Sequence, residues 1–204
     1  MNVQATCLLG NNEIEALLSA TCDDIFSVLG MHDHPLVNGL IARVFLPGAT
    51  AVDVIASKDG ANVASLNLIN EAGLFEGKLG RRRKPFSYHL QVSYGDELEV
   101  MEDPYRFPSL LDADDLYLFG EGTQEQLYQW MGAHRRQIDG VEGMSFVLWA
   151  PDASRVSVVG QFNAWDGRRH VMRKHPASGV WEIFVPGVGE GQAYKFEIAS
   201  RNGE

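Results

Sequence analysis

The sequence predicts an all-β protein of two tandem β-sandwiches with a few short helices, in which the second sandwich stops before its last strand. Three observations lead to this prediction. Short apolar runs separated by Gly, Pro, Asp and Asn recur along the chain, the pattern of sandwich strands. The second half repeats the first at nearly constant spacing. Between the halves, a stretch with two prolines and four aspartates (102–115) interrupts the apolar pattern.

The predicted elements follow from local patterns. A short helix is expected after Asn12 as cap, with Ile14, Leu17 and Leu18 on one face. An amphipathic helical turn is expected over 124–131. Short runs that carry Val, Ile, Leu and Phe between Gly, Pro, Asp and Asn predict strands at 38–46, 51–57, 63–69, 73–79, 86–93 and 97–101. Further strands are predicted at 116–119, 144–149, 155–160, 180–185 and 192–199.

The repeat is visible in the letters themselves. RVFLPGATAVDVI (43–55) matches FVLWAPDASRVSVV (146–159), with Pro47 opposite Pro151. GLFEGKL (73–79) matches GVWEIFV (179–185), and YHLQV (88–92) matches YKFEI (194–198). Upstream, DIFSVLG (24–30) matches DLYLFGE (115–121) at a smaller spacing, which predicts an insertion in the second copy that contains the 124–131 helix.

These matches predict two immunoglobulin-like domains, 1–105 and 106–204, each large enough for its own core. The first copy continues through ELEVMEDPY after its last matched strand, whereas the second ends at ASRNGE. The second domain is therefore expected to be incomplete, as in a fragment of a longer protein.

Charge and hydropathy exclude several classes of function. The chain has 204 residues, a formal net charge of −10 and a pI of about 5.0, so nucleic acid is not an expected partner. The basic run Arg81-Arg82-Arg83-Lys84 is expected to be a solvated hairpin loop. No apolar run approaches the ~18 residues of a membrane span. With no secretory pattern at the N-terminus, a cytoplasmic protein is expected, and Cys7 and Cys22 are expected as free thiols. A monomer is also expected.

The sequence lacks the patterns of a catalytic or metal site. His32-Asp33-His34 has no further ligands at useful spacing, so a solvated or capping loop is expected there. His134-Arg135-Arg136 is expected just after a helix, where basic groups are favoured. No phosphate loop, G-x-S-x-G motif or acid/base pair of carboxylates is apparent. On these grounds the segment itself is not expected to be catalytic.

Three of the four tryptophans are expected in the core. Trp149 and Trp181 match Phe45 and Phe75 of the first copy, so the fold requires large apolar residues at both positions. Trp130 shares a helical face with Leu127 and is expected to pack on the sandwich.

Trp165, in the loop GQFNAWDG (160–167), differs because its counterpart in the first copy is Ala61. The fold does not require an aromatic residue there, which favours a functional role for Trp165. An exposed indole beside amide groups suits a pyranose ring, which has one apolar face and polar edges. We expect a weak carbohydrate-binding site made of Trp165, Asn163 and Lys195.

The stretch SFVLWAPDASRVSVVGQFNAWDG (145–167) and its continuation to residue 198 resemble the family-48 carbohydrate-binding module of 1,4-α-glucan branching enzymes. DPYRFPSLLDADDLYLFGEGTQEQLYQWMGAH (103–134) is similar to the junction of their two N-terminal domains, and DDIFSVLGMH (23–32) to the start of the first. The tryptophan of the FNxW motif matches Trp165 and the lysine of YKF matches Lys195. A second sugar-binding tryptophan of similar modules has no match.

The resemblance implies a retaining transferase that forms α-1,6 branch points in glycogen on a (β/α)₈ barrel. It implies no metal or organic cofactor, and α-1,4-glucan and the chain's own C-terminal catalytic barrel as partners. No barrel motif lies within 1–204, so no catalytic residue is assigned. The alternatives are a free-standing glycogen-binding regulatory module, the same module in a debranching or trehalose-releasing enzyme, and a purely structural pair of sandwiches.

Overall fold

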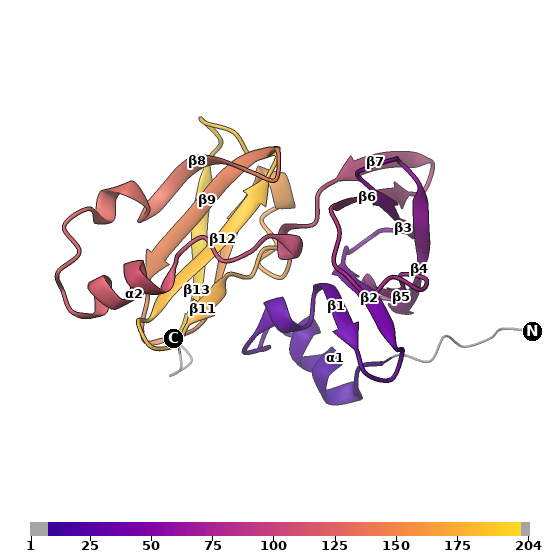
Figure 1. Ribbon diagram of the computed structural model, residues 1–204, viewed down its shortest axis with the longest axis horizontal. Helices are drawn as coiled ribbons and strands as arrows, with labels where there is room; N and C mark the ends of the chain where they lie inside the picture. The colour runs from indigo at the N-terminus through magenta and orange to yellow at the C-terminus, as the bar shows by residue number, and fades with distance from the viewer. Residues whose placement is uncertain (1–7, 201–204) are drawn as a thin grey trace, which may run out of the picture. The chain divides into compact units, whose positions relative to one another are not determined.

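The computed structural model describes residues 8–200 (Figure 1). The described chain forms two compact units. Of the described residues, 8–15 and 26–106 lie in the first unit, and 16–25 and 107–200 lie in the second. Most of both units is antiparallel β-structure, which confirms the predicted all-β fold class. Cys7 lies outside the described residues, so the state of the Cys7 and Cys22 thiols stays a prediction. Within 8–200 no helix is long and apolar enough to cross a membrane.

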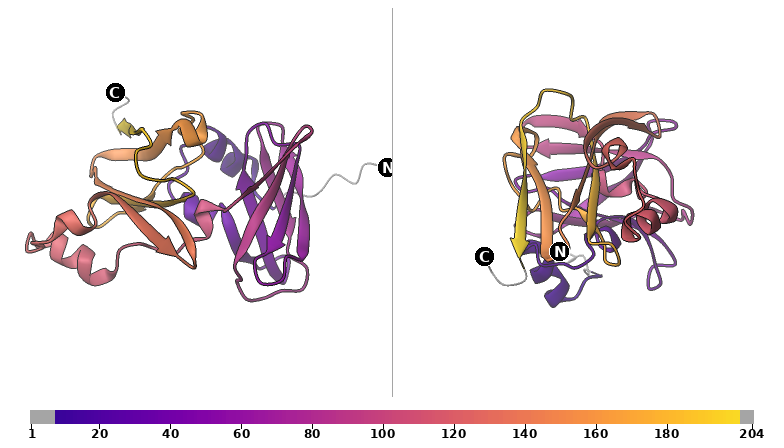
Figure 2. Two further views of the ribbon diagram at one scale, coloured as in Figure 1. Left: turned by 90° about the horizontal axis from the view of Figure 1, so that it is seen from above. Right: turned by 90° about the vertical axis from the view of Figure 1, so that its left-hand side faces the viewer.

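The first unit is a single curled sheet of seven strands in the order β1-β2-β5-β4-β3-β6-β7. Strand β4 pairs with both β3 and β5 and so joins the two halves of the sheet, whose strands run alongside one another in Figure 2 (left). Helix α1 (Asn11–Leu18) begins in this unit and the 3₁₀ turn η1 (Ile25–Ser27) ends in it, while η2 (Pro104–Arg106) lies wholly within it. Its strands are β1 (Gly30–His34), β2 (Gly39–Phe45), β3 (Ala51–Ala56), β4 (Asn62–Asn70), β5 (Leu74–Lys78), β6 (Tyr88–Tyr94) and β7 (Glu97–Met101).

The core of the first unit lies between the two halves of the curled sheet. Alternate residues of facing strands fill it, as the two-residue period of strands requires. Its buried members are Leu40, Ala42, Val44, Leu46, Ala49, Val52, Val54, Leu66, Phe75, Leu79, Tyr88, Leu90 and Val92. The basic run 81–84 is exposed in the turn before β6, as expected.

The second unit contains a four-stranded sheet, β11-β12-β9-β8, and the two-stranded sheet β10-β13. Its helices are α2 (Ala113–Gly120), η3 (Leu127–Gln129) and η4 (Gln161–Asn163). Its strands are β8 (Gly132–Ile138), β9 (Val141–Trp149), β10 (Ala153–Gly160), β11 (Arg173–His175), β12 (Val180–Pro186) and β13 (Tyr194–Ser200).

Strand register confirms the internal repeat. In the first unit Val44 of β2 lies opposite Phe75 of β5. In the second, Leu148 of β9 lies opposite Trp181 of β12, which are the residues that the sequence match pairs with them. The same correspondence relates β3 to β10 and β6 to β13, which pair antiparallel in both units.

The prediction of an insertion in the second copy is wrong. Residues 24–32 match 126–134 rather than 115–121, at a constant spacing (134 − 32 = 102). On this register η1 matches η3, α1 matches α2, and β1 matches β8. His32 Nε2 lies 2.7 Å from the carbonyl oxygen of Leu29, and His134 Nε2 lies 2.9 Å from that of Met131, the same contact in both copies.

Several local expectations are also corrected. Residues 116–119 belong to helix α2 instead of a strand, because the Asp112 side chain accepts from the Asp115 N–H at 2.8 Å and caps the helix. The helix expected over 124–131 is reduced to the single 3₁₀ turn η3. His32-Asp33-His34 lie on β1 and His134-Arg135-Arg136 on β8. Strands β1, β8 and β11 were not predicted, because none of them has a clear alternation of apolar and polar residues in the sequence.

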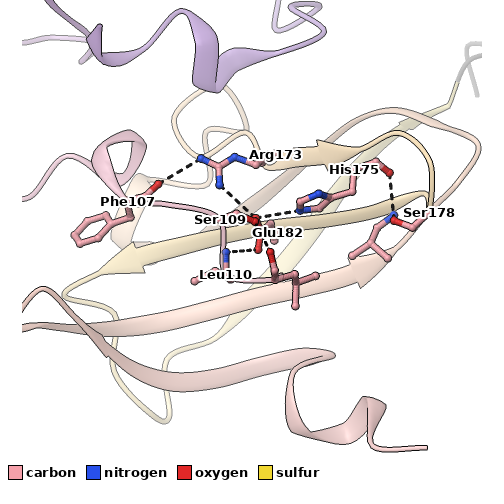
Figure 3. A network of polar contacts seen from close by, with 9 residues as sticks. Phe107, Ser109, Leu110, Arg173, His175, Ser178 and Glu182 are labelled. Atoms are coloured by element: carbon pink, nitrogen blue, oxygen red, sulfur yellow. Dashed lines mark hydrogen bonds and ion pairs between the residues drawn. The ribbon is translucent and has the colours of Figure 1, made fainter. Parts of the chain in front are cut away.

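Residues 107–111, which lead into α2, are bound along the outer face of β12 (Figure 3). Glu182 is buried and accepts hydrogen bonds from the Ser109 hydroxyl at 2.7 Å and the Leu110 N–H at 2.8 Å. Arg173 and His175 lie 3.3 Å and 3.1 Å from its Oε1. Burial opposes ionisation of Glu182, but these donors outweigh it and hold its pKa below the usual value.

The first unit contains the same arrangement of a buried glutamate and a backbone N–H. Glu76, the counterpart of Glu182, is buried, accepts from the Leu8 N–H at 3.0 Å and pairs with Arg43 at 2.5 Å. In both units a buried carboxylate therefore holds the backbone that precedes a helix. The sequence match extends to these residues, since Leu8-Leu9 corresponds to Leu110-Leu111.

The burial of the tryptophans agrees with the prediction for two of the three that were expected in the core. Trp181 and Trp130 are buried, as expected. The expectation for Trp149 is wrong, because its side chain is 57% exposed. Trp149 ends β9 at the rim of the sheet, where its Nε1 donates to the Ser178 carbonyl oxygen at 3.1 Å. The repeat predicted its strand position and its face, but not how much of the chain covers that face.

Candidate functional site

The loop after β10 occupies the place where the first unit continues into β4. In the first unit β4 pairs with β3 from Asn62 onward. In the second unit, residues 161–169 leave the sheet, and the chain pairs with β10 again at the bridge of Val171 to Ser157. The second unit thus has room at the end of β10 for an exposed loop that the first unit lacks.

Asn163 is the internal support of this loop. It is 1% exposed, and its Oδ1 accepts from the Gly160 N–H at 2.9 Å. Its Nδ2 donates to the Val158 carbonyl oxygen at 2.8 Å and lies 3.0 Å from Nδ1 of His170. Each polar atom of the amide therefore has a partner within the loop and its neighbouring strand.

His170 completes this support as a neutral imidazole. Burial, with a smaller effect of Arg169, lowers the pKa of His170 to about 3. With the proton on Nε2, Nδ1 is free to accept from the Asn163 amide. The ring also packs edge-on against Phe162, with 5.6 Å between ring centroids. The contacts of Asn163 and His170 fix the backbone on both sides of the exposed residues.

Trp165 is held outward by an unusual backbone conformation. Ala164 and Trp165 both have left-handed φ angles, 54° and 60°, a region that costs a non-glycine residue roughly 1 kcal/mol or more. Hydrogen bonds from the Trp165 N–H to the Gly160 oxygen at 2.9 Å and from the Asp166 N–H to the Asn163 oxygen at 3.1 Å maintain it. The side chain is 44% exposed.

The end of the loop is fixed by charge. Asp166 accepts from the Arg168 backbone N–H at 3.0 Å and from its guanidinium at 2.7 Å and 2.9 Å. These bonds from Arg168 outweigh partial burial and lower the pKa of Asp166. The Arg168 guanidinium remains partly exposed.

Strand β13 lies next to the loop. Lys195 is exposed and lies opposite Val159 of β10. Glu197 is on the same face two residues later and pairs with Arg155 at 2.7 Å. The Glu197 carboxylate also fills the space at Gly167, where a Cβ would collide with it. The face that carries Lys195 is therefore the one against which the loop rests.

The three site residues predicted from the sequence differ in their exposure to solvent. Trp165 and Lys195 are exposed, on the loop and on the strand face beneath it. Asn163 is buried, where it supports the loop. Sequence reasoning missed Arg168, Glu197 and His170. The spacing Asp-x-Arg at 166–168 and the alternation of Lys195 with Glu197 were the available signals for two of them.

This arrangement favours binding over catalysis. An exposed indole lies on a loop that also carries the Arg168 guanidinium and that rests on the strand face of Lys195 and Glu197, which suits a ligand with one apolar face and a hydroxylated edge. Across residues 8–200 no three His, Cys, Asp or Glu side chains gather as metal ligands would.

Comparison with known proteins finds a matching family model for each unit. Residues 10–105 match the family model "alpha-1,4-glucan branching enzyme GlgB, N-terminal domain", and residues 130–204 match "Carbohydrate-binding module 48 (Isoamylase N-terminal domain)". Among solved structures, a pullulanase from Anoxybacillus sp. LM18-11 in complex with maltotriose aligns over 79% of this chain and 22% of its own at 13% identity. Its TM-score of 0.29 is too low to support an inference.

Curated relatives align along the whole chain. The 1,4-alpha-glucan branching enzyme GlgB of Shewanella sp. (strain MR-4) is 55% identical over 100% of this chain and 27% of its own length. That of Shewanella frigidimarina (strain NCIMB 400) is 50% identical over 92% of this chain and 25% of its own. The chain spans about a quarter of the length of these relatives. It belongs to the family of 1,4-α-glucan branching enzymes and corresponds to their N-terminal region, including the family-48 carbohydrate-binding module.

Proposed function

We propose that this chain is the non-catalytic, glucan-positioning part of a 1,4-α-glucan branching enzyme, and that its second unit binds α-glucan at Trp165. The observation that supports this most strongly is the indole of Trp165, 44% exposed on a loop whose strained backbone is maintained by buried polar groups. Strained, over-determined positions of this kind concentrate at ligand-binding sites. The matched position in the first unit is Ala61.

In this proposal one glucose ring stacks on the indole, and Lys195 and Arg168 donate hydrogen bonds to its hydroxyl groups. Asn163 contributes by holding the loop. The site is small and open, so an individual chain end should bind weakly, with a Kd on the order of millimolar. The relatives' names supply the reaction: a branching enzyme acts on 1,4-α-glucan, and this segment would hold that substrate while a catalytic barrel elsewhere in the same protein transfers it.

The binding site is tested by following the four indole N–H resonances of the chain in a titration with maltoheptaose. The Trp165 resonance should shift progressively, while those of buried Trp130 and Trp181 stay unchanged. Cellohexaose, whose β-linked chain has a different curvature, is the matched control ligand. A titration in which Trp165 does not move at maltoheptaose concentrations well above the millimolar range would contradict the proposed site.

A further inference from the structure

The connection between β5 and β6 concentrates positive charge in the first unit. Residues 78–84, the basic loop, include Lys78, Arg81, Arg82, Arg83 and Lys84 and no acidic residue. The whole chain has 17 Lys and Arg against 27 Asp and Glu. Outside the basic loop, 12 basic residues therefore stand against 27 acidic ones, a net charge of −15. The basic loop is a local exception in a strongly acidic chain.

The second unit shows that the fold does not require these charges. At the spacing that relates YHLQV (88–92) to YKFEI (194–198), GRRRKPFS (80–87) corresponds to PGVGEGQA (186–193). The two segments are equally long and connect corresponding strands, β5 to β6 and β12 to β13. The second segment is rich in glycine, and its only charged residue is Glu190. A connection of the same length is therefore made without any basic residue.

The backbone of the basic loop is held at its middle. The Arg82 N–H donates to the Leu79 carbonyl oxygen at 3.4 Å, and the Arg82 carbonyl oxygen accepts from the Leu40 N–H of β2 at 3.1 Å. The Leu79 N–H donates in turn to the Leu40 oxygen at 2.8 Å. The guanidinium carbon of Arg82 lies 4.5 Å from the centroid of the Phe86 ring. A held backbone lowers the cost of ordering the loop when a ligand binds.

The basic side chains are directed to solvent. All five of them are exposed. Within residues 8–200, no carboxylate forms an ion pair with Lys78, Arg81, Arg83 or Lys84. Neighbouring like charges repel, and screening over a Debye length of about 8 Å does not remove repulsion between adjacent residues. An anion bound among them relieves this repulsion and uses donors that the chain itself leaves unused.

The residue types favour phosphate as the anion. A guanidinium offers a fork of N–H donors to two oxygens of one phosphoryl group, and a guanidinium that stacks on a ring keeps the edge with those donors open. A small anion responds mainly to the charge within a Debye length of the loop. An acidic protein, an anionic membrane or a nucleic acid would instead meet the net charge of −10 of the whole chain.

We propose that the basic loop binds a small anion with two adjacent phosphoryl groups. Arg81, Arg83 and Lys84 donate to the phosphate oxygens, and Arg82, held on Phe86, completes the positive field. Inorganic pyrophosphate and nucleoside diphosphates share this group. The site is open, so its Kd is on the order of 0.1–1 mM. A neutral glucan needs no such charges, so this proposal is independent of glucan binding at Trp165.

The test is a titration of the full chain with sodium pyrophosphate at constant ionic strength and without divalent cations, followed through backbone amide and arginine Nε–H resonances. The resonances of residues 80–84 should shift to saturation. Orthophosphate and sulfate should bind about tenfold more weakly or less, because each offers one group in place of two. Adenosine diphosphate separates the two sources: equal affinity identifies the diphosphate group alone as the ligand, and tighter binding adds a nucleoside contact.

A pair of variants tests the assignment to the basic loop. Arg83→Gln should weaken pyrophosphate binding by about tenfold, since one charge-assisted contact is lost. Arg135→Gln is the matched control, because Arg135 is an exposed arginine of the second unit and its replacement changes the net charge equally. Its effect should stay below about twofold. Both residues are exposed, so both variants should fold.

Three outcomes would overturn the proposal: equal weakening by the two variants, shifts that do not saturate, or orthophosphate binding as tight as that of pyrophosphate. Binding of anionic lipid vesicles or of a polyglutamate peptide without any binding of pyrophosphate would also overturn it. The shift of the Trp165 indole with maltoheptaose should be the same in Arg83→Gln as in the unaltered chain. Failure of this site and failure of the glucan site are therefore read from different resonances.

Discussion

The amide of Asn163 lies 3.0 Å from Nδ1 of His170, beneath the loop that presents Trp165. Asn163 is buried and His170 is partly buried. The exposed tryptophan therefore depends on a polar support that belongs to the interior of the second unit. This relationship makes two predictions about residues that a sugar would not contact.

Replacing the support should weaken glucan binding without removing any contact group. Asn163→Ala leaves the Gly160 N–H and the Val158 oxygen without their partners, which should destabilise the second unit by about 2–3 kcal/mol. The loop should lose its fixed conformation, so retention in a glycogen-containing gel should fall nearly as far as it does for Trp165→Ala. Full retention by a folded Asn163→Ala protein would show that the support is not needed.

His170 should stay neutral across the physiological range, because its pKa is lowered to about 3. Unfolding raises that pKa toward its ordinary value of about 6.5, so the stability contributed by the neutral ring is present above pH ~6.5 and is lost as the pH falls toward 3. The C2 proton of His170, followed by NMR, should show no titration between about pH 8 and 5. A midpoint near the ordinary value of about 6.5 would contradict the desolvation of the ring.

Glu182 should be the most sensitive carboxylate of the second unit. Glu182→Ala leaves Ser109, the Leu110 N–H and two basic side chains without a common acceptor, and should cost about 3 kcal/mol or more. Glu190→Ala, at an exposed glutamate of the same unit, should cost less than about 0.5 kcal/mol. Urea unfolding measures both, and similar values for the two variants would contradict the buried network.

The folded pKa of Glu182 is lowered, so its contribution is present above an unfolded pKa of about 4.3 and is lost as the pH falls below that. Glu182→Gln should flatten this part of the stability profile. An unchanged acid dependence in that variant would place the dependence elsewhere.

Asp103 of the first unit should show the opposite pH dependence. Burial raises its pKa to about 6, against opposing bonds from Tyr88 and Tyr105. Its contribution is greatest below the unfolded value of about 3.9 and is lost as the pH rises through about 6, a change of roughly 3 kcal/mol. Carbon-detected NMR of the Asp103 carboxyl should give a midpoint near pH 6, and Asp103→Asn should abolish the slope of stability between about pH 4 and 6.

The extent of sequence-based prediction differs from residue to residue. Phe75 and Trp181 were matched through the repeat, and both are buried at equivalent positions in the sheet. This was predictable because the local sequence determines both the alternation of side chains along a strand and the size of the residue at each position. Trp149 was matched in the same way but is exposed, since the cover on a face comes from distant chain. The support of Trp165 by His170 was also not predictable, because it joins residues through a loop whose backbone has no counterpart in the first unit.

The central claim is that Trp165 is the sugar-stacking residue of the second unit, and affinity electrophoresis in glycogen tests it most directly. Trp149→Ala is the matched control, since Trp149 is also an exposed tryptophan of the second unit, at the end of β9. Trp165→Ala should weaken retention by about tenfold, equivalent to ~1.4 kcal/mol, while Trp149→Ala migrates like the unaltered chain. Equal retention of Trp165→Ala and the unaltered chain would contradict the account.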